Sequence, residues 1–255
     1  MRRSWAIVRH EMRILASDPG TIVFILLMPL LMMAFLKPVY RLALIAQGYL
    51  DANGAEQAVP GMAVTFASFF SGFVGFAFMR EHGWGTWERL RASHAGPLEI
   101  MAGKVVPALA MAALQMLVLF AAGGWLFGLR VRGSLLGVAA VAVALSVCLI
   151  AFGMAITAFS KTAQQLNAYG SLGGILFATL GGAFAPLDVM PGWARAIAPA
   201  MPTYWAMRGF NQVVLEAGGL AAVALPVLVL AAFTAGLVAL TYWRFSFEET
   251  KIYFG

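Results

Sequence analysis

The sequence predicts an all-α integral membrane protein with six transmembrane helices, and three observations lead to that fold class. Hydrophobic residues make up 62% of the 255-residue chain, against roughly 45–50% in soluble domains. Charged residues make up only 11%, against about 25% in a soluble domain. The apolar residues also gather into long runs. A soluble enzyme, a disordered chain and a free nucleic-acid-binding protein are therefore excluded, and nucleic acid is not expected as a partner.

Six apolar segments are long enough to cross a membrane. A helical span needs about 20 apolar residues to cross ~30 Å of hydrocarbon. Strands of a membrane barrel alternate apolar and polar residues, whereas these segments are apolar on every face, so each is predicted to be a helix. The predicted spans are 21–43, 59–79, 105–129, 135–159, 166–185 and 220–243. Together they form a single predicted transmembrane domain over 1–255.

Lysine and arginine are distributed unequally between the two sides of the predicted domain. With six spans, both termini lie on one side, together with the loop 80–104. That side collects eleven of the 17 basic residues, and the other side collects six. Because cytoplasmic loops carry an excess of Lys and Arg, we expect a multi-pass protein of the cell membrane with both termini in the cytoplasm.

The segment 1–18 is predicted to be an amphipathic helix. Its apolar residues recur at spacings of three and four, which places them on one helical face, and its arginines fall on the other. One interpretation is an interfacial anchor lying flat on anionic lipid; the other is a docking helix for a cytoplasmic partner. Pro19 disfavours a helical conformation of the residue before it, Asp18. The helix is therefore expected to end at this point, and the chain turns into the membrane. The candidate residues are Trp5, Arg9, Met12, Arg13, Asp18 and Pro19.

The loop 80–104 is the largest predicted cytoplasmic loop. Thr86 is placed to cap a short helix over 87–92, with Glu88 in the first turn, where the helix dipole favours an anion. A simple connection between two spans needs fewer residues, so the loop is interpreted as a folded contact surface, with a solvated turn as the alternative. A second short turn is expected over 98–102. The candidate residues are Arg80, Glu81, Trp84, Gly85, Thr86, Trp87, Glu88, Arg89, Leu90 and Arg91.

The segment 186–219, on the outer side, is rich in proline and aromatic residues and too apolar for a free loop. Two short helices are predicted, over 192–198 and over 203–216, with Thr203 as the cap of the second. Non-helical backbone at membrane depth is tolerated only where protein or water covers it. The segment is therefore predicted to form a helical hairpin that re-enters the outer leaflet. Its candidate residues are Pro186, Met190, Pro191, Trp193, Pro202 and Tyr204.

The predicted fifth span carries glycines at helical spacing. Gly170 and Gly174 form a small-xxx-small pair, which lets two helix backbones approach closely. Two interpretations stay open, namely packing within the monomer and a seam between two copies.

The sequence offers no recognisable nucleotide-binding or catalytic motif. A phosphate-binding loop needs the pattern G-x-x-x-x-G-K-[ST], and the nearest match, from Gly96 to Lys104, is two residues too long. The three histidines lack the spacing of a zinc-binding helix, and the spans hold no carboxylate pair for an ion relay. We therefore expect no catalytic residue, no metal and no cofactor in this chain, and an energy source outside it.

Four stretches, in this order, resemble the membrane subunit of a type 2 ATP-binding-cassette (ABC) transporter of the antibiotic or drug exporter kind. They are the N-terminal helix ending in Ser17-Asp18-Pro19, the segment Arg80-Glu81 followed by Gly85-Thr86-Trp87-Glu88-Arg89-Leu90-Arg91-Ala92-Ser93, its continuation through Leu98-Glu99-Ile100 and Gly103-Lys104, and the outer stretch from Pro186 to Tyr204. The sequence departs from the family pattern at His94, where a proline often follows the serine.

The resemblance implies a permease subunit that moves a hydrophobic or amphiphilic compound (a drug, antibiotic, lipid or glycolipid) out of the cytoplasm or inner leaflet. Such subunits pair with a second copy or a paralogue, and two separate ATPase subunits bind the ATP and Mg²⁺. The resemblance also implies that the loop 80–104 holds a coupling helix and that the outer hairpin acts as a gate. With this resemblance, Gly170 and Gly174 are expected at the dimer seam. The apolar side chains of Phe66, Phe69 and Phe73 are expected at the seam or pathway, where they suit a hydrophobic cargo, with a lipid-facing role as the alternative. A non-transporting scaffold or sensor, or an intramembrane lipid-modifying enzyme, are the alternatives.

Overall fold

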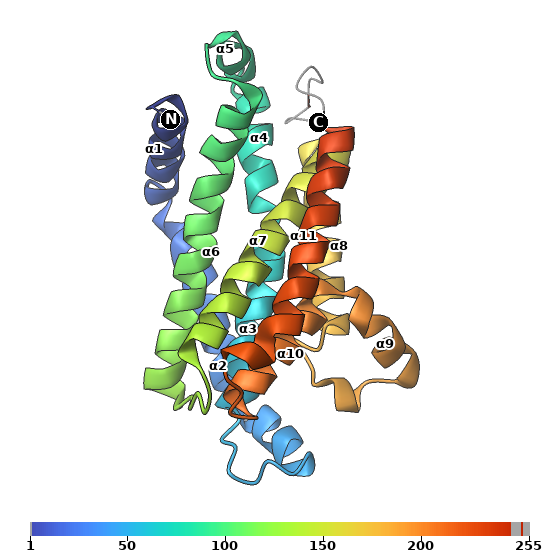
Figure 1. Cartoon of the computed structure of the whole chain (residues 1–255). Helices are drawn as coiled ribbons and strands as arrows, with labels where there is room; N and C mark the ends of the chain where they lie inside the picture. The colour runs from blue at the N-terminus through green and yellow to red at the C-terminus, as the bar shows by residue number, and fades with distance from the viewer. Residues whose placement is uncertain (1, 246–250, 252–255) are drawn as a thin grey trace.

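The computed structural model describes residues 2–245 and Lys251, and every regular element in that part of the chain is a helix (Figure 1). Met1, 246–250 and 252–255, which the predicted domain included, lie outside the described residues. The helices are α1 Arg2–Ala16, α2 Pro19–Ala46, α3 Ala55–Phe70, α4 Phe73–Gly83, α5 Trp87–Ala92, α6 Pro97–Phe127, α7 Leu135–Phe159, α8 Ala163–Leu180, α9 Gly192–Ile197, α10 Pro202–Val214 and α11 Ala224–Arg244. Short 3₁₀ turns cover Leu187–Val189, Ala198–Ala200 and Leu220–Val223.

Five helical segments of the described chain are long and apolar enough to cross a membrane. They are Pro19–Ala46, Ala55–Gly83, Pro97–Phe127, Leu135–Phe159 and Leu220–Arg244. They overlap the first four predicted spans and the sixth, and they make the chain a multi-pass helical membrane protein.

The predicted fifth span corresponds to α8, which is more polar than the other five. Its 18 residues rise about 27 Å, but the glutamines and the asparagine in its first turns lower its hydropathy. The helix ends at Leu180, five residues short of the predicted end, because Gly182 has a φ of +80° that ends regular helix. Membrane crossing by α8 therefore stays a prediction.

The second predicted span is broken in the middle, where the sequence predicted one continuous helix. α3 ends at Phe70 and α4 begins at Phe73. The two residues between them are Ser71 and Gly72, a serine–glycine pair of the kind found at helix kinks. A side chain on Gly153 of α7 would overlap the carbonyl oxygen of Ser71, so α7 packs directly against the break.

The third predicted span begins earlier than the sequence suggested. α6 runs without interruption from Pro97, so the separate turn expected over 98–102 is instead its first turns. Proline is favoured at the first helical position, and the Glu99 carboxylate accepts a hydrogen bond of 3.2 Å from the Gly96 amide. These two local signals are what start α6 so far outside the apolar run.

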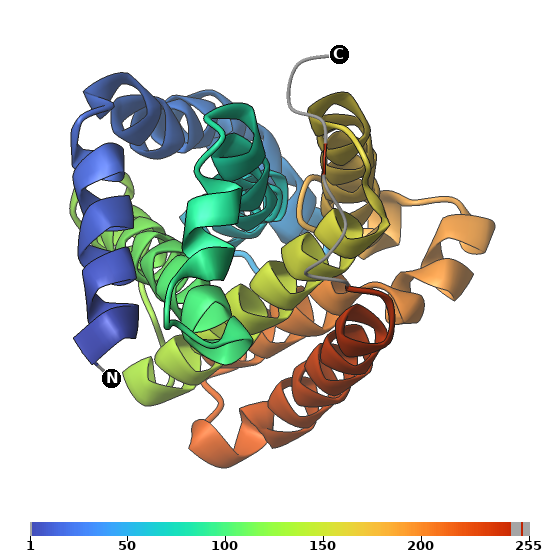
Figure 2. The ribbon, with the colours of Figure 1, turned by 90° about the horizontal axis from the view of Figure 1, so that it is seen from above.

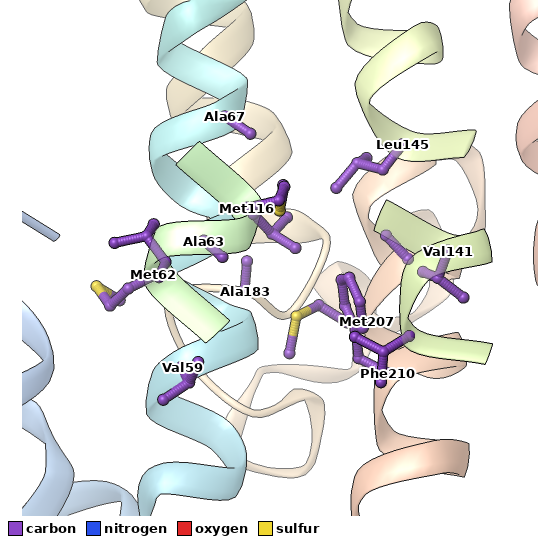
Figure 3. Packing of buried hydrophobic residues seen from close by; sticks show 14 of the residues in the cluster. Val59, Met62, Ala63, Ala67, Met116, Val141, Leu145, Ala183, Met207 and Phe210 are labelled. Carbon is purple, nitrogen blue, oxygen red and sulfur yellow. The ribbon is translucent and has the colours of Figure 1, made fainter. Parts of the chain in front are cut away.

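The main core lies between α3, α6, α7 and α10 (Figure 3). Val59, Met62 and Ala63 of α3 face Met116 of α6. α10 returns into the bundle, where Met207 and Phe210 fill the space beside α7. The buried residues of α10 occupy one face of an amphipathic helix.

The helices that flank this core define two ends of the molecule. α1 and α5 lie together at one end, and α9 projects near the other (Figure 1). Seen from the α5 end, α1 runs beside α6, and α11 lies along α7 (Figure 2). α2 and α11 bury few of their apolar residues within the chain, so their outer faces are available to lipid or to another protein.

Candidate functional site

Four charged side chains form a cluster at the α5 end of the bundle, three of them buried and Arg80 half-buried. These are Glu11 of α1, Arg80 and Glu81 of α4, and Lys104 of α6, called here the ion-pair cluster. The Lys104 ammonium donates to Glu11 Oε1 at 2.8 Å and to Glu81 Oε1 at 2.9 Å. Its third hydrogen bond, of 2.8 Å, reaches the Ala77 carbonyl oxygen. The Lys104 side chain is thus fully buried with all three of its donors used.

The ion-pair cluster is electrically balanced. Arg80 pairs with the second carboxylate oxygen of Glu11, so two cations meet two anions. Buried charges are costly unless they are paired and hydrogen-bonded, and each of these four charges is paired with an opposite one. Three helices that are distant in sequence are therefore joined at one point.

Glu81 also connects the ion-pair cluster to the loop that follows α4. The Thr86 hydroxyl donates to the Glu81 carboxylate, and Thr86 makes no side-chain capping bond to α5. Its predicted role as a capping side chain is therefore wrong, because the nearby carboxylate is the stronger acceptor. The predicted bounds of this helix are confirmed, since α5 covers Trp87–Ala92.

α5 is seated on the bundle through its first residue. Trp87 is 3% exposed. Its ring stacks on His82, with centroids 4.6 Å apart, and meets Phe78 edge-on at 6.3 Å. Lys104 Nζ lies 5.5 Å from the centroid of the Phe78 ring. The apolar layer under α5 and the ion-pair cluster are therefore in direct contact.

The side chains around α5 that face away from the bundle are exposed, and they include aromatic, aliphatic and charged residues. We call this set the tip surface, and it consists of Trp84, Glu88, Arg89, Arg91 and Leu98. Trp84 is 54% exposed and Leu98 is 80% exposed, and Leu90 lies half-buried beneath them. The Arg91–Glu88 pair, at 3.3 Å, is an exposed pair within one helix turn, of a kind that contributes only about 0–1 kcal/mol.

Gly85 makes the reversal between α4 and α5 possible. Its φ of +66° lies in the left-handed region, which glycine adopts without the steric cost that other residues meet. This turn directs α5 back over the end of α4.

α1 contacts the bundle through part of the predicted apolar face, because Val8 and Leu15 of that face are buried. Glu11 is also buried, whereas Trp5 and Met12, predicted for the same apolar face, are exposed. A side chain on Gly103 of α6 would overlap Ile7, so glycine allows the close approach. The predicted polar residues Arg9 and Arg13 are exposed.

The junction between α1 and α2 has the predicted form. Asp18 accepts hydrogen bonds from the Thr21 hydroxyl and the Thr21 amide, and α2 begins at Pro19. The bond from the Thr21 hydroxyl, followed by that from its amide, holds the pKa of Asp18 below its ordinary value. The carboxylate therefore stays charged at neutral pH and caps the helix.

The segment 186–219 contains two short helices close to the predicted ones, α9 over Gly192–Ile197 and α10 over Pro202–Val214. Pro191 precedes α9, where Trp193 is 64% exposed, and Pro202 begins α10. The predicted cap, Thr203, instead donates at 2.6 Å to the Phe177 carbonyl oxygen of α8, because the helix starts one residue earlier. Pro186, Met190 and Tyr204 are partly exposed.

Gly170 and Gly174 are buried against the second span of the same chain. A side chain on Gly170 would lie 3.8 Å from the Cα of Gly72, and one on Gly174 would meet Phe69 at 3.0 Å. Phe66 and Phe73 are partly buried, and Phe69 remains 45% exposed. The exposed face of α8 carries other residues, namely Tyr169, Leu172, Ile175 and Leu176.

Sequence reasoning missed Glu11, and it placed Leu98 and Lys104 in the stretch that resembles the coupling segment without giving either a role as a site residue. Glu11 and Lys104 each interrupt an apolar helical face, at a spacing of three or four from buried residues such as Val8 and Ile100. A charge on an apolar face indicates a buried partner. That signal identifies both residues but not the pairing between them.

Comparison with known proteins agrees with this architecture. Residues 2–215 match the family described as ABC-2 type transporter. The linearmycin resistance permease protein LnrN of Bacillus subtilis (strain 168) is 31% identical over 133 residues, which cover 51% of this chain. The match covers only 34% of that relative's length. The chain belongs to the ABC-2 type transporter family, as a membrane subunit of the permease kind.

Proposed function

We propose that the chain is the permease subunit of an ATP-driven exporter and that a cytoplasmic ABC ATPase binds its tip surface. The observation that carries the proposal is the burial of Lys104 between Glu11 and Glu81. A loop that only had to connect two spans would not need the helices on either side of it, α4 and α6, to be joined to each other and to α1 by buried ion pairs.

In this proposal the ion-pair cluster transmits movement. Separating one partner from a buried charge pair costs on the order of 3–5 kcal/mol, so the helices that meet at Lys104 move together. A displacement of α5 by the ATPase then shifts α4 and α6 through Glu81, and shifts α1 through Glu11. The break at Ser71 and Gly72 lies further along the second span, where α4 can pivot relative to α3.

The pivot adjoins the proposed seam and pathway. Gly72 lies against Gly170 of α8, and Phe69 lies against Gly174. Rotation of α4 moves Phe73 relative to Phe66 and Phe69 of α3, and so changes the surface that these residues present to a second permease copy or a paralogue. A hydrophobic or amphiphilic cargo, such as an antibiotic, drug, lipid or glycolipid, fits apolar walls of this kind. Export of an antibiotic accords with the resistance named in the relative's description.

The remaining partners follow from the same arrangement. Two ATPase subunits, one on each permease copy, bind ATP and Mg²⁺, and this chain supplies no nucleotide site. Both termini and the tip surface face the cytoplasm of a cell membrane. The hairpin of α9 and α10 lies on the outer side, re-enters the outer leaflet and acts as a gate or exit guide.

Binding of the ATPase to the permease in detergent tests the docking surface. The variant combines Trp84→Ala with Leu98→Ala, and the matched control is Trp193→Ala, an exposed tryptophan of α9, which projects near the other end of the bundle (Figure 1). An interface tryptophan at a hot spot contributes about 2 kcal/mol or more, so the double variant should lose about 30-fold in affinity or more. The control should bind like the wild type.

ATP-driven transport separates an exporter from a scaffold or sensor. Inverted vesicles holding the permease and its ATPase should accumulate a fluorescent amphiphile only when ATP is present. The double variant should lose both this accumulation and the stimulation of ATPase activity. Normal ATPase binding without transport of any amphiphile would favour the scaffold, and unchanged binding by the double variant would overturn the docking assignment.

A further inference from the structure

A large apolar groove lies between α6 and α7, near the segment that connects these two helices and away from α5. Its volume is about 1030 Å³, at the upper end of the roughly 300–1,000 Å³ of typical ligand pockets. Met116, Phe120 and Gly124 line it from α6, and Ala139 and Ala142 line it from α7. The wall is therefore built almost entirely from aliphatic and aromatic surface.

The hydroxyl in this wall is already satisfied. Ser146 lines the groove and donates at 2.7 Å to the Ala142 carbonyl oxygen. Apolar cavities of this kind stay dry and accept apolar guests. Because α6 and α7 are both long enough to span a membrane, the apolar groups next to the groove are the acyl chains of the bilayer lipids.

The mouth of the groove is basic. The non-helical segment 128–134 joins α6 to α7. Leu129, Val131 and Gly133 line the groove, whereas the intervening Arg130 and Arg132 are exposed. This alternation is the one expected of an extended chain, whose successive side chains point to opposite faces. The two exposed arginines therefore extend from the end of the groove on the side away from its wall, where their long side chains can reach a charged group at the groove's end.

The mouth also lies at the level where a lipid headgroup would be. Trp125, three residues before the segment, is exposed, and exposed tryptophans of membrane helices gather at the membrane–water interface. Arginine matches phosphate geometry through paired hydrogen bonds. Basic residues at the edge of a groove between transmembrane helices are a feature of sites for anionic lipid headgroups.

We propose that this groove binds an anionic phospholipid. An acyl chain lies between α6 and α7, and the phosphate lies at Arg130 and Arg132. This site is separate from the tip surface and does not depend on ATPase coupling.

Native mass spectrometry of the full-length protein in detergent tests the site. The protein is incubated with phosphatidylglycerol or with phosphatidylcholine of the same acyl chains. The wild type should retain phosphatidylglycerol about tenfold more strongly, which corresponds to about 1.4 kcal/mol. The double variant Arg130→Gln with Arg132→Gln should lose this preference, and Arg195→Gln, an exposed arginine of α9, should keep it.

A second variant tests the groove itself. Ala139→Phe fills the space from an exposed position of α7, so it should reduce the retention of both lipids while the thermal midpoint of unfolding stays unchanged. Equal retention of the two lipids by the wild type would overturn the proposal. So would wild-type retention by both groove variants.

A second copy of the chain is the competing occupant, and cross-linking detects it. Cys148 is the single cysteine of the sequence and is buried, so Ala139→Cys introduces one accessible thiol. A lipid-filled groove should give no disulfide-linked dimer in membranes. Efficient dimer formation through position 139 would show that another permease copy covers the groove, and would overturn lipid binding there.

Discussion

Lys104 and Glu11 are 93 positions apart in the sequence, yet Lys104 Nζ lies 2.8 Å from Glu11 Oε1. The contact joins the first turns of α6 to the middle of α1, below the surface of the bundle. A buried pair of this kind is not a strong source of stability by itself, because desolvation offsets the attraction. Its loss is nevertheless costly, because either partner alone is a buried charge.

Lys104→Met should destabilise the protein strongly. The substitution leaves Glu11 and Glu81 with Arg80 as the remaining cation of the ion-pair cluster, so one buried negative charge is uncompensated. The expected loss is about 3–5 kcal/mol, seen as a drop of several degrees in the thermal unfolding midpoint in detergent. The stimulation of ATPase activity by the permease should decrease together with the unfolding midpoint.

Two variants show whether the charge imbalance is the cause. Lys161→Met removes an exposed lysine just before α8 and should leave the midpoint unchanged. Adding Glu11→Leu to Lys104→Met restores electrical balance with Arg80 and Glu81, so the double variant should be more stable than Lys104→Met alone. A Lys104→Met protein with the wild-type midpoint would contradict the ion-pair cluster.

Gly85→Ala should weaken the seating of α5. A side chain in the left-handed region costs about 1–2 kcal/mol, although nothing lies within 4 Å of the added methyl group. Because the strain is confined to the turn, hydrogen exchange in the loop 80–104 should speed up more than exchange in α6 or α7. ATPase stimulation should decrease in proportion.

Gly96→Ala is the matched control for this strain. Gly96 also has open space around the added methyl group, but its φ of −71° is ordinary for any residue. Gly96 is the N-cap of α6, where alanine is less favourable than glycine, so any faster exchange should be confined to the first turn of α6 and should leave α5 like the wild type. Equal exchange in the two variants would mean that the left-handed turn is not required.

Features set by neighbouring residues were predictable from the sequence. The bounds of α5 follow from Gly85 before it and Ser93 after it, and the start of α2 follows from Asp18 and Pro19. Five of the six spans follow from apolar length alone. α8 was harder to predict, because its polar first turns and Gly182 shorten the apolar run on both sides.

Features set by tertiary contacts were not predictable. The ion-pair cluster unites residues from α1, α4 and α6, and a single sequence carries no record of which charges meet. The same contact rotates α1, so that Glu11 faces inward and Trp5 faces outward, against the apolar pattern. Thr86 shows the same effect on a small scale. Its hydroxyl, which was expected to cap α5, instead donates a hydrogen bond to the Glu81 carboxylate.

Gly153→Ala should destabilise the contact between α7 and the broken second span. Its methyl group would overlap the Ser71 carbonyl oxygen, and backbone atoms cannot move aside as a flexible side chain can. Overpacking of this kind costs about 1–3 kcal/mol, so the thermal midpoint should fall.

Gly124→Ala is the control for α-helical glycine in general. Gly124 lies inside α6 with nothing within 4 Å of the added methyl group. Alanine is favoured over glycine in a helix by about 0.5–1 kcal/mol, so this variant should unfold at a slightly higher temperature. If both variants raised the midpoint, α7 would not be packed against the break.

Trp87→Ala should remove the apolar support of α5, whereas Trp84→Ala should not. Trp87 is buried against Phe78 and His82, and truncating a buried aromatic side chain costs about 3–5 kcal/mol. Trp87→Phe retains an aromatic ring at this position and should cost less. The exposed Trp84 can be shortened with little change in the unfolding midpoint, but at the expense of ATPase affinity. Equal midpoints for Trp87→Ala and Trp84→Ala would mean that the buried tryptophan does not hold α5 on the bundle. The apolar contacts of Trp87 would then not connect the tip surface to Lys104.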